Sequence, residues 1–379
     1  MAFDLKHHCA LTCIIFASLL TLSVSISPKI IDEVVLWQSN EAGFTYFRIP
    51  VVIRIPNGDL LAFSGAHKSS LSDIDAKGLA MRRSTDTGYS WKPMEIIYED
   101  LSVKEGYLNI GAALVDHDKN ITMFLYCHCP HRQCGPGVIP ANYIIKSHDF
   151  GYTWSEPEDL SVKNPAFKNW TWCPGPGYGI QKRFDPAKGR LIVCGHTVDR
   201  NKQASEIVYC VHSDDHGSSW QIGGSLVGVP YKVPKKTGDF MPDESQIVEL
   251  SDGSLLMNSR NQFHFHCLCR IISRSFDGGL SFPMPHVKVD PKLIDPACDG
   301  SIIIHKGIMF FSNPASTKGR ENMTVRWSLN NGTSWEGALF VFPGNSEYST
   351  LTEIDSNSIG LLYEKNNYKE VSFVKIQIH

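Results

Sequence analysis

The sequence has no marked excess of charge of either sign and, beyond its N-terminal segment, no long apolar run. Its 379 residues include 36 lysines and arginines against 39 aspartates and glutamates, a formal net charge of −3. A nearly neutral chain with scattered basic residues lacks the positive surface that binds nucleic acid, which excludes nucleic acid as the main partner. No apolar run after the N-terminal segment reaches the roughly 18 residues that are needed to span a bilayer.

Helical periodicity is also missing, since no long stretch repeats apolar residues every three or four positions. Hydrophobic residues nevertheless make up 42% of the chain and aromatic residues 11%, enough for a packed core rather than disorder. Short apolar runs flank turn-forming residues, and these paired runs cover residues 51–55 and 60–63, 245–250 and 254–257, and 301–304 and 308–311. Each pair predicts a β-hairpin.

An octapeptide occurs five times, at residues 84–91, 147–154, 213–220, 275–282 and 328–335. Each copy has Ser first, Asp or Asn third, Gly fifth, and Trp or Phe last. The third residue can close a turn by accepting backbone hydrogen bonds, and glycine supplies a conformation that other residues resist. A catalytic group is needed once, whereas a turn is needed in every repeat. We therefore interpret the five acidic or amide residues as structural.

The spacing of the octapeptides, measured between their third residues, is 63, 66, 62 and 53 residues. A period of this length with several strands in each repeat is typical of an all-β propeller. Five repeats, together with strand-like segments at 34–37 and 359–378, predict six blades. The last blade would be closed by pairing the two ends of the chain.

The N-terminal residues 1–25 are similar to a secretory signal peptide. Lys6 precedes an apolar stretch over 10–24, and Ser23 and Ser25 are the small residues expected before a cleavage site. A membrane anchor is the alternative, but polar residues interrupt this short stretch. Four glycosylation sequons, at Asn120, Asn169, Asn322 and Asn331, agree with passage through the secretory route. Residues 26–379 are then predicted to form a single domain.

The cysteines give less information about the protein than the sequons do. Two of the 11 cysteines lie in the predicted signal peptide, which leaves an odd number, so at least one thiol has no partner within the chain. Two clusters of cysteine and histidine, at 127–134 and 264–269, have a metal-site composition but not the spacing of a zinc site. Disulfides or buried thiols are the favoured interpretation, and no metal or other cofactor is predicted.

The chain resembles the sialidases. The octapeptide is their Asp box, and Phe47-Arg48-Ile49-Pro50 matches their Arg-Ile-Pro signature. Further segments are most similar to lysosomal members of the family, namely Asp243-Glu244, Asn258-Ser-Arg260-Asn-Gln262, Cys194-Gly-His196, Cys173-Pro-Gly-Pro-Gly177, Phe311-Ser-Asn-Pro314 and Leu362-Tyr-Glu364-Lys365. The resemblance runs from about Arg48 to the C-terminus. It implies a six-bladed propeller and a retaining exo-α-sialidase that releases terminal sialic acids from glycoproteins, oligosaccharides or glycolipids.

The resemblance implies that three arginines bind the carboxylate of the sugar. They are Arg48, Arg260 and Arg320, although the match around Arg320 is loose because Lys318 and Arg326 are also basic. Arginine suits this role because its guanidinium can hold a carboxylate with two parallel hydrogen bonds.

Carboxyl groups and one tyrosine complete the site that the resemblance implies. Glu364 would orient Arg48, and Tyr348 would be the nucleophile, since the substrate's own carboxylate repels an anionic one. Free tyrosine has a pKa of about 10 and needs a neighbouring base, for which Glu244 is the candidate and Asp243 the rival. Asp73 would be the acid/base that protonates the leaving oxygen, with Asp75 as the rival two residues away.

One position departs from the family pattern. An arginine that contacts the sugar in the family is replaced here by His67, which follows Leu60-Leu-Ala-Phe-Ser-Gly-Ala66. Histidine is charged only near or below its pKa of about 6.5. We predict that His67 contributes to substrate binding at low pH.

The resemblance extends to location and partners. It implies a lysosomal enzyme, with an extracellular one as the alternative, and a lysosomal serine carboxypeptidase similar to cathepsin A as a partner. Residues 374–379 lack the tyrosine-based sorting signal of the lysosomal enzymes. Two other functions stay open, a propeller that binds sialic acid without turnover and a trans-sialidase that transfers the sugar to another glycan.

Overall fold

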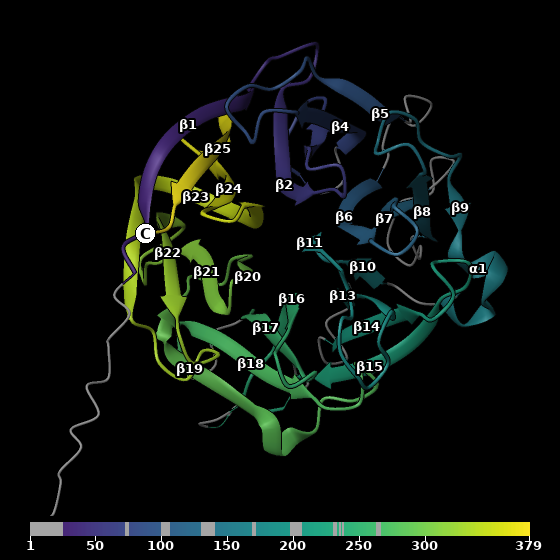
Figure 1. Cartoon of the computed structure of the whole chain (residues 1–379), viewed down its shortest axis with the longest axis vertical. Coiled ribbons are helices and arrows are strands. Elements are labelled where there is room, and N and C mark those ends of the chain that lie inside the picture. The colour runs from purple at the N-terminus through teal and green to yellow at the C-terminus, as the bar shows by residue number, and fades with distance from the viewer. Residues whose placement is uncertain are drawn as a thin grey trace, which may run out of the picture.

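The computed structural model describes residues 26–72, 76–99, 107–129, 141–168, 172–197, 207–229, 233–234, 236, 239–262 and 267–379. In this part of the chain, β-sheets follow one another in chain order around a central axis, as Figure 1 shows. Helical structure in these described ranges is limited to α1 (Leu160–Lys163) and two 3-10 turns, Pro165–Phe167 and Met284–His286. No helix among the described residues is long and apolar enough to cross a membrane.

Two sheets form the first part of the ring. One has the order β2-β3-β4-β5 and is built from β2 (Tyr46–Arg54), β3 (Leu60–His67), β4 (Ala76–Ser84) and β5 (Glu95–Glu99). The next has the order β11-β6-β7-β8-β9 and is built from β6 (Tyr107–Asp116), β7 (Ile121–Cys129), β8 (Ala141–Ser147), β9 (Glu158–Asp159) and β11 (Gly177–Tyr178). Neighbours pair antiparallel in both sheets, except that β11 runs parallel to β6.

Two further antiparallel sheets continue the ring. The third contains β10 (Trp172–Pro174), β12 (Ile180–Gln181), β13 (Leu191–Thr197), β14 (Ile207–Ser213) and β15 (Gln221–Val227). The fourth contains β16 (Pro242–Glu249), β17 (Leu255–Asn261), β18 (Cys269–Ser275) and β19 (Val287–Ile294).

The last sheet corrects the predicted number of blades. It has seven strands in the order β1-β25-β24-β23-β22-β21-β20, namely β20 (Ser301–His305), β21 (Ile308–Pro314), β22 (Glu321–Ser328), β23 (Gly337–Asp355), β24 (Ser358–Lys365), β25 (Glu370–Gln377) and β1 (Lys29–Gln38). The first half of the 19-residue strand β23 pairs with β22 and its second half with β24. The propeller fold is therefore confirmed, but the structure has five hydrogen-bonded sheets instead of six separate blades. The predicted pairing of the two chain ends is present as the antiparallel pair β1 and β25.

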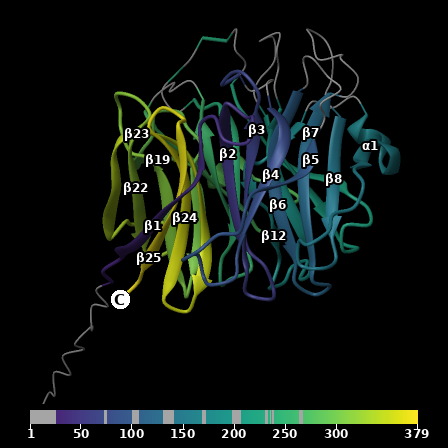
Figure 2. The ribbon, with the colours of Figure 1, turned by 90° about the horizontal axis from the view of Figure 1, so that it is seen from above.

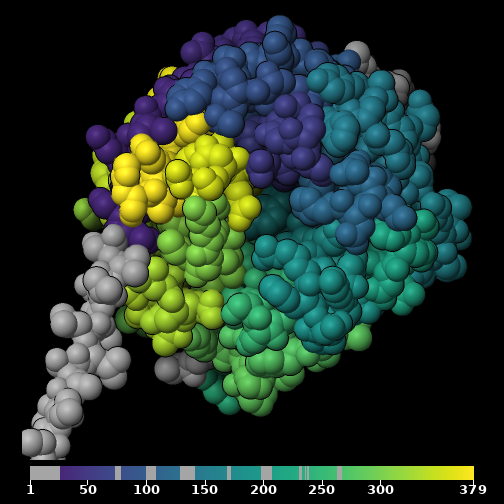
Figure 3. Space-filling model, viewed as in Figure 1, coloured from purple at the N-terminus to yellow at the C-terminus, as the bar shows by residue number. Residues whose placement is uncertain are grey.

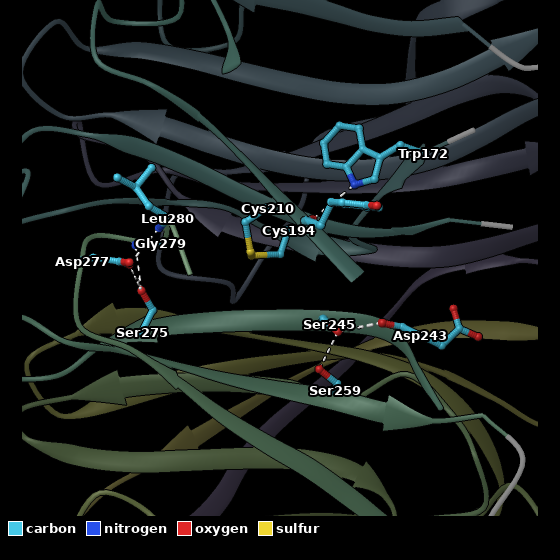
Figure 4. Close-up of a disulfide and its surroundings, with 11 residues drawn as sticks. Trp172, Cys194, Cys210, Asp243, Ser245, Ser259, Ser275, Asp277, Gly279 and Leu280 are labelled. Carbon is cyan, nitrogen blue, oxygen red and sulfur yellow. Dashed lines mark hydrogen bonds between the residues drawn. A yellow bond between two sulfur atoms is a disulfide. The ribbon is translucent and has the colours of Figure 1, made fainter. Parts of the chain in front are cut away.

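The five octapeptides form the same turn, each between the last two strands of a repeat. The hydroxyl of the first residue accepts a hydrogen bond from the glycine N–H at 2.7–2.9 Å. The third residue accepts one from the backbone N–H of the seventh at 2.8–3.0 Å. The glycines have φ between 76° and 92°, a conformation in which other residues are strained. Figure 4 shows the pattern at Ser275, Asp277 and Gly279, and the structural interpretation of these turns is confirmed.

The hydrophobic core lies between neighbouring sheets. Phe63 of β3 packs against Phe124 of β7 in the next sheet, with ring centroids 5.0 Å apart, and against Trp154, the last residue of the second octapeptide, at 5.9 Å. Burying one such side chain stabilises the fold by about 1.5–3 kcal/mol. Figure 2 shows that the strands run between the two faces of the disc, so this packing extends through its thickness.

The described cysteines agree with disulfides and buried thiols rather than with metal ligands. Cys194 and Cys210 form a disulfide between β13 and β14, drawn in Figure 4, and Cys267 and Cys269 form another. Cys298 is a buried thiol. Residues 130–134 and 264–266 of the two cysteine and histidine clusters lie outside the described residues.

A cavity lies at each end of the inner strands. One, of about 480 Å³, is lined by residues at the start of β2 and β16, and the other, of about 650 Å³, by residues at the end of the same strands. The three predicted hairpins, β2–β3, β16–β17 and β20–β21, are all present. Figure 3 shows one face of the molecule hollowed where the sheets meet.

Candidate active site

The 480 Å³ cavity brings together most of the residues predicted for the site. Five of them line it, namely Arg48 of β2, Glu244 of β16, Arg260 of β17, Tyr348 of β23, and Arg320 next to β22. These residues are separated by up to 300 positions in the sequence, so the ring closure is what makes them neighbours. All five side chains line the cavity, and Tyr348 also packs against the hydrophobic core.

Tyr348 and Glu244 are in direct contact. The phenol of Tyr348 donates a short hydrogen bond to Oε1 of Glu244. Arg260 donates from one nitrogen to Glu244 Oε2 at 2.6 Å and to the Tyr348 oxygen at 3.2 Å. All three side chains are largely buried, with 6–9% of their surface exposed. The arrangement gives the phenol a proton acceptor and a cationic neighbour at once.

The electrostatics of this contact shift the pKa values of Tyr348 and Glu244 in opposite directions. Burial and the negative charge of Glu244 raise the pKa of Tyr348 well above its usual value. For Glu244, burial acts against ionisation, but the charge of Arg260, together with His196 and the phenol hydrogen bond, lowers its pKa overall. Glu244 is therefore an ionised acceptor and Tyr348 a protonated donor. A proton can move from Tyr348 to Glu244 only as new bonding to the phenol oxygen develops.

Asp243, the predicted rival of Glu244, points elsewhere. Its Oδ1 lies 3.4 Å from Nε2 of His196, and its Oδ2 lies 3.9 Å from Arg260 Nε. No hydrogen bond joins Asp243 to Tyr348 among the described residues. The geometry favours Glu244 as the partner of the phenol.

Glu364 connects the two strands that carry Arg48 and Tyr348. Its fully buried carboxylate accepts hydrogen bonds from the backbone N–H of Ile49 at 2.7 Å and of Tyr348 at 3.0 Å. It also lies 4.0 Å from Arg48 Nε, and Arg48 donates to the Leu71 carbonyl at 2.7 Å. Ile49 has φ of 59°, which is rare for a β-branched residue, and the pairing of β2 with β3 is irregular there. Glu364 thus stabilises a local distortion that directs Arg48 into the cavity.

Arg320 lies over the ring of Tyr348. Its guanidinium carbon is 5.4 Å from the centre of the Tyr348 ring, and the guanidinium carbon of Arg48 is 6.0 Å from it. Of the other basic candidates, Arg326 bonds Asn313 on β21 at 3.2 Å, and neither Arg326 nor Lys318 lines the cavity. Among these three, the structure places Arg320 at the site.

Besides the buried Glu364, two predicted site residues are not among those that line the cavity. Asp73, predicted as the acid/base, lies outside the described residues, although Leu71 and Ser72, the last residues before it that the structure describes, line the cavity. His67 is on β3 with 1% of its surface exposed and is not among the lining residues. Every residue of β3 is buried, so this histidine is packed inside its sheet. Its role in substrate binding stays a prediction.

The cavity also contains residues to which the sequence analysis assigned no role. Asn109 and Tyr368 lie outside the segments that carry the family resemblance, whereas Pro174, Pro176, His196 and Gln262 lie within them. His196 had a signal, since Cys194-Gly-His196 is one of the segments that carry the family resemblance, but nothing in it pointed to contact with Asp243. Tyr368 had none, because it follows a polar turn after β24.

The described residues offer one group with the composition of a metal site, outside this cavity. Single ligand atoms of Asp116, Asp118 and His216 lie within 4.8 Å of one another. His216 Nδ1 is 2.7 Å from Asp116 Oδ2, and Gln181 bonds both aspartates at 3.0 Å. The group is satisfied by its own hydrogen bonds, and we assign no metal to it.

Comparison with known proteins identifies the family and the fold. The family model of the BNR repeat-like domain matches residues 58–361. A sialidase of Micromonospora viridifaciens is 32% identical over 345 residues, 85% of this chain and 50% of that protein. An exo-alpha-sialidase of Aspergillus fumigatus is 27% identical over 88% of this chain and 82% of its own length, and mouse Sialidase-2 is 24% identical over 88% and 92%. The chain spans 50% and 60% of the Micromonospora and Bacteroides fragilis relatives it matches.

Solved structures show the same fold. A Hadza microbial sialidase superposes with a TM-score of 0.73 at 23% identity, covering 90% of this chain and 68% of the other. The intramolecular trans-sialidase of Ruminococcus gnavus superposes with a TM-score of 0.71 at 17% identity, covering 90% and 96%.

Proposed function

We propose that this chain, which belongs to the sialidase family and carries its BNR-type repeats, is an exo-α-sialidase that removes terminal sialic acids with retention of configuration. One observation carries the proposal. Three arginines and a hydrogen-bonded tyrosine and glutamate pair line a single cavity. The substrates are sialylated glycoproteins, oligosaccharides or glycolipids.

The arginines account for recognition of an anionic sugar. Arg48, Arg260 and Arg320 would hold the carboxylate beside the reacting carbon, since charge-assisted and bidentate hydrogen bonds from guanidinium groups are the strongest available for this group. Arg260 is already bonded to Glu244, whereas among the described residues the Arg320 guanidinium donates one hydrogen bond, to Tyr368, and keeps further donors for a ligand.

The tyrosine accounts for the chemistry. In the first step the Tyr348 oxygen bonds to the anomeric carbon, the glycosidic bond breaks, and the phenolic proton passes to Glu244. Asp73 donates a proton to the leaving oxygen. In the second step Asp73 takes a proton from water, which attacks the anomeric carbon, and Tyr348 leaves and recovers its proton from Glu244. Two displacements at one carbon retain its configuration.

Turnover of an aryl α-sialoside between pH 4 and 7 tests the activity. Tyr348→Phe should lower kcat by a factor on the order of 100 or more, because it removes the nucleophilic oxygen. Glu244→Gln and Asp73→Ala should also lower kcat, while Tyr363→Phe, a buried tyrosine away from the cavity, should leave it near wild type. Proton NMR of the first product should show the α-anomer.

Other results would favour other functions. Folded protein that binds sialic acid without turnover would be a sialic-acid-binding propeller. Transfer to an added glycan, or an intramolecular product, would indicate a trans-sialidase, and structural neighbours named for that activity share the fold. An inverted first product would contradict the proposed role of Tyr348.

We also propose passage through the secretory route, most simply to the lysosome, with cleavage of residues 1–25 and a cathepsin A-like carboxypeptidase as partner. Asn120 and Asn331 lie in exposed turns suited to glycans, whereas Asn322 is half-buried and Asn169 is outside the described residues. N-terminal sequencing of protein from a secretory host, glycosidase digestion, and co-purification with the carboxypeptidase test these points. An uncleaved, unglycosylated product would contradict them.

A further inference from the structure

Tyr368 contacts two of the cavity arginines at once. Its oxygen accepts a hydrogen bond from Arg320 at 3.1 Å, and its ring centre lies 5.0 Å from the guanidinium carbon of Arg48. Within the described part of the chain, this is the single hydrogen bond from the Arg320 guanidinium, and no carboxylate lies within ion-pair distance of it. Tyr368 itself lines the cavity. A neutral side chain therefore fixes Arg320, where a carboxylate would be the usual partner.

A neutral partner has a consequence for ligand binding. A carboxylate beside Arg320 would compete with an incoming carboxylate for the same N–H groups. The phenol accepts one hydrogen bond and adds no negative charge, so the remaining donors and the full positive charge stay available. Burial and the charge of Glu364 raise the pKa of Tyr368 to about 12, so the phenol stays neutral at acid and neutral pH.

The backbone that presents Tyr368 is unusual. Asn366, Asn367 and Tyr368 have successive φ values of 56°, 56° and 61° between β24 and β25. The left-handed region costs a bulky residue such as tyrosine roughly 1–2 kcal/mol. The turn is held by β1, because the N–H of Ser39 donates to the Lys369 carbonyl at 2.8 Å. The structure keeps this conformation although it is costly, and the result is that the Tyr368 ring lies against Arg48 while its oxygen bonds Arg320.

We propose that Tyr368 is a positioning residue that orients Arg48 and Arg320 for the substrate carboxylate. This inference rests on the proposed function for the identity of the ligand. It differs from that proposal in predicting an effect that depends on the charge of the carboxyl group.

The test compares Tyr368→Phe with wild type in binding sialic acid and its uncharged methyl ester, by calorimetry at pH 5. The variant keeps the ring and loses the oxygen. We expect binding of the acid to weaken about tenfold, as for a hydrogen bond to a charged group, with binding of the ester unchanged. Tyr363→Phe is the matched control, since its phenol donates to Glu33 at 3.1 Å outside the cavity, and it should bind both ligands as wild type does. Tyr368→Leu, which also removes the ring, should weaken acid binding further.

Each outcome decides the role of Tyr368. A loss that is equal for acid and ester, or no loss at all, overturns the positioning role even if wild type turns over sialosides. A loss confined to the acid supports it, and does so even if wild type shows no turnover, in which case the proposed enzymatic activity fails alone. Wild type that binds neither ligand overturns both proposals.

Discussion

Replacing Glu347 by glutamine should make the protein more stable at alkaline pH. Glu347 directly precedes Tyr348 on β23, and 3% of its surface is exposed. One of its carboxyl oxygens has no hydrogen-bond partner among the described residues. Burial and the nearby Glu364 raise its pKa to about 8, although Arg320 and Arg48 act in the opposite direction.

The sign of the effect follows from proton binding. A carboxyl group whose pKa is higher in the folded state holds its proton there while the unfolded chain ionises. This group costs the fold nothing below pH 4.5, and its penalty grows until pH reaches about 8, after which it is constant. At about 1.4 kcal/mol for each pH unit, the full penalty is about 5 kcal/mol. We expect about half of this penalty, 2–3 kcal/mol, because neighbouring cations and local rearrangement can stabilise the ionised form of Glu347.

Urea unfolding of wild type and Glu347→Gln at pH 5 and pH 8.5 measures this penalty. The two proteins should have nearly equal free energies of unfolding at pH 5, and the variant should be more stable at pH 8.5. Glu95→Gln, at an exposed position of β5, is the control, and its free energy of unfolding should equal that of wild type at both pH values. Equal pH dependence of wild type and Glu347→Gln would refute the reasoning, as would a variant that is less stable at pH 8.5.

Three further substitutions have defined outcomes. Ser213→Ala should cost about 1–3 kcal/mol in urea unfolding, because it leaves the buried N–H of Gly217 without its acceptor at 2.8 Å, while alanine at an exposed serine of the same turn should cost less. Arg270→Leu should cost about 3–5 kcal/mol, because it leaves the buried Asp295 carboxylate without its partner at 3.1 Å, and an unchanged midpoint would contradict this. Gly177→Ala should lower both the melting temperature and kcat/KM. The φ of Gly177 is +121°, which strains other residues, and a Cβ there would lie 1.8 Å from the side-chain nitrogen of Gln246 beside the cavity.

The predictable part of the fold is the part with local causes. The five octapeptide turns were readable because every hydrogen bond in them joins residues within a few positions, as from Gly217 to Ser213. The hairpins were readable for the same reason. The number of separate sheets was not, because it depends on whether β23 breaks at Pro343 and Gly344, and the strand instead continues through them from one pairing partner to the next.

The residues of the site can also be divided into those that the sequence predicted and those that it could not. Family resemblance selected Arg48, Glu244, Arg260 and Tyr348, and the cavity brings them together. The sequence could not show that His67 would be enclosed in β3, since burial there depends on the strands on either side. Nor could it show the two contacts of Tyr368, which depend on the conformation of a turn and on arginines about 50 and 320 positions away.

The two cavities of the propeller show why one end of the inner strands is suited to bind an anion. In the larger cavity, the buried Lys182 is neutralised by Glu249 at 2.6 Å and by the Gly253 carbonyl at 2.7 Å, and Glu249 also accepts two backbone N–H groups. The charges of Lys182 and Glu249 therefore satisfy one another, although Arg54, Arg183 and Lys188 also line this cavity. In the smaller cavity, Arg320 is held by a phenol. Positive charge that is positioned but not neutralised is what a carboxylate requires, and the guanidinium of Arg320 meets this requirement in a way that Lys182 does not.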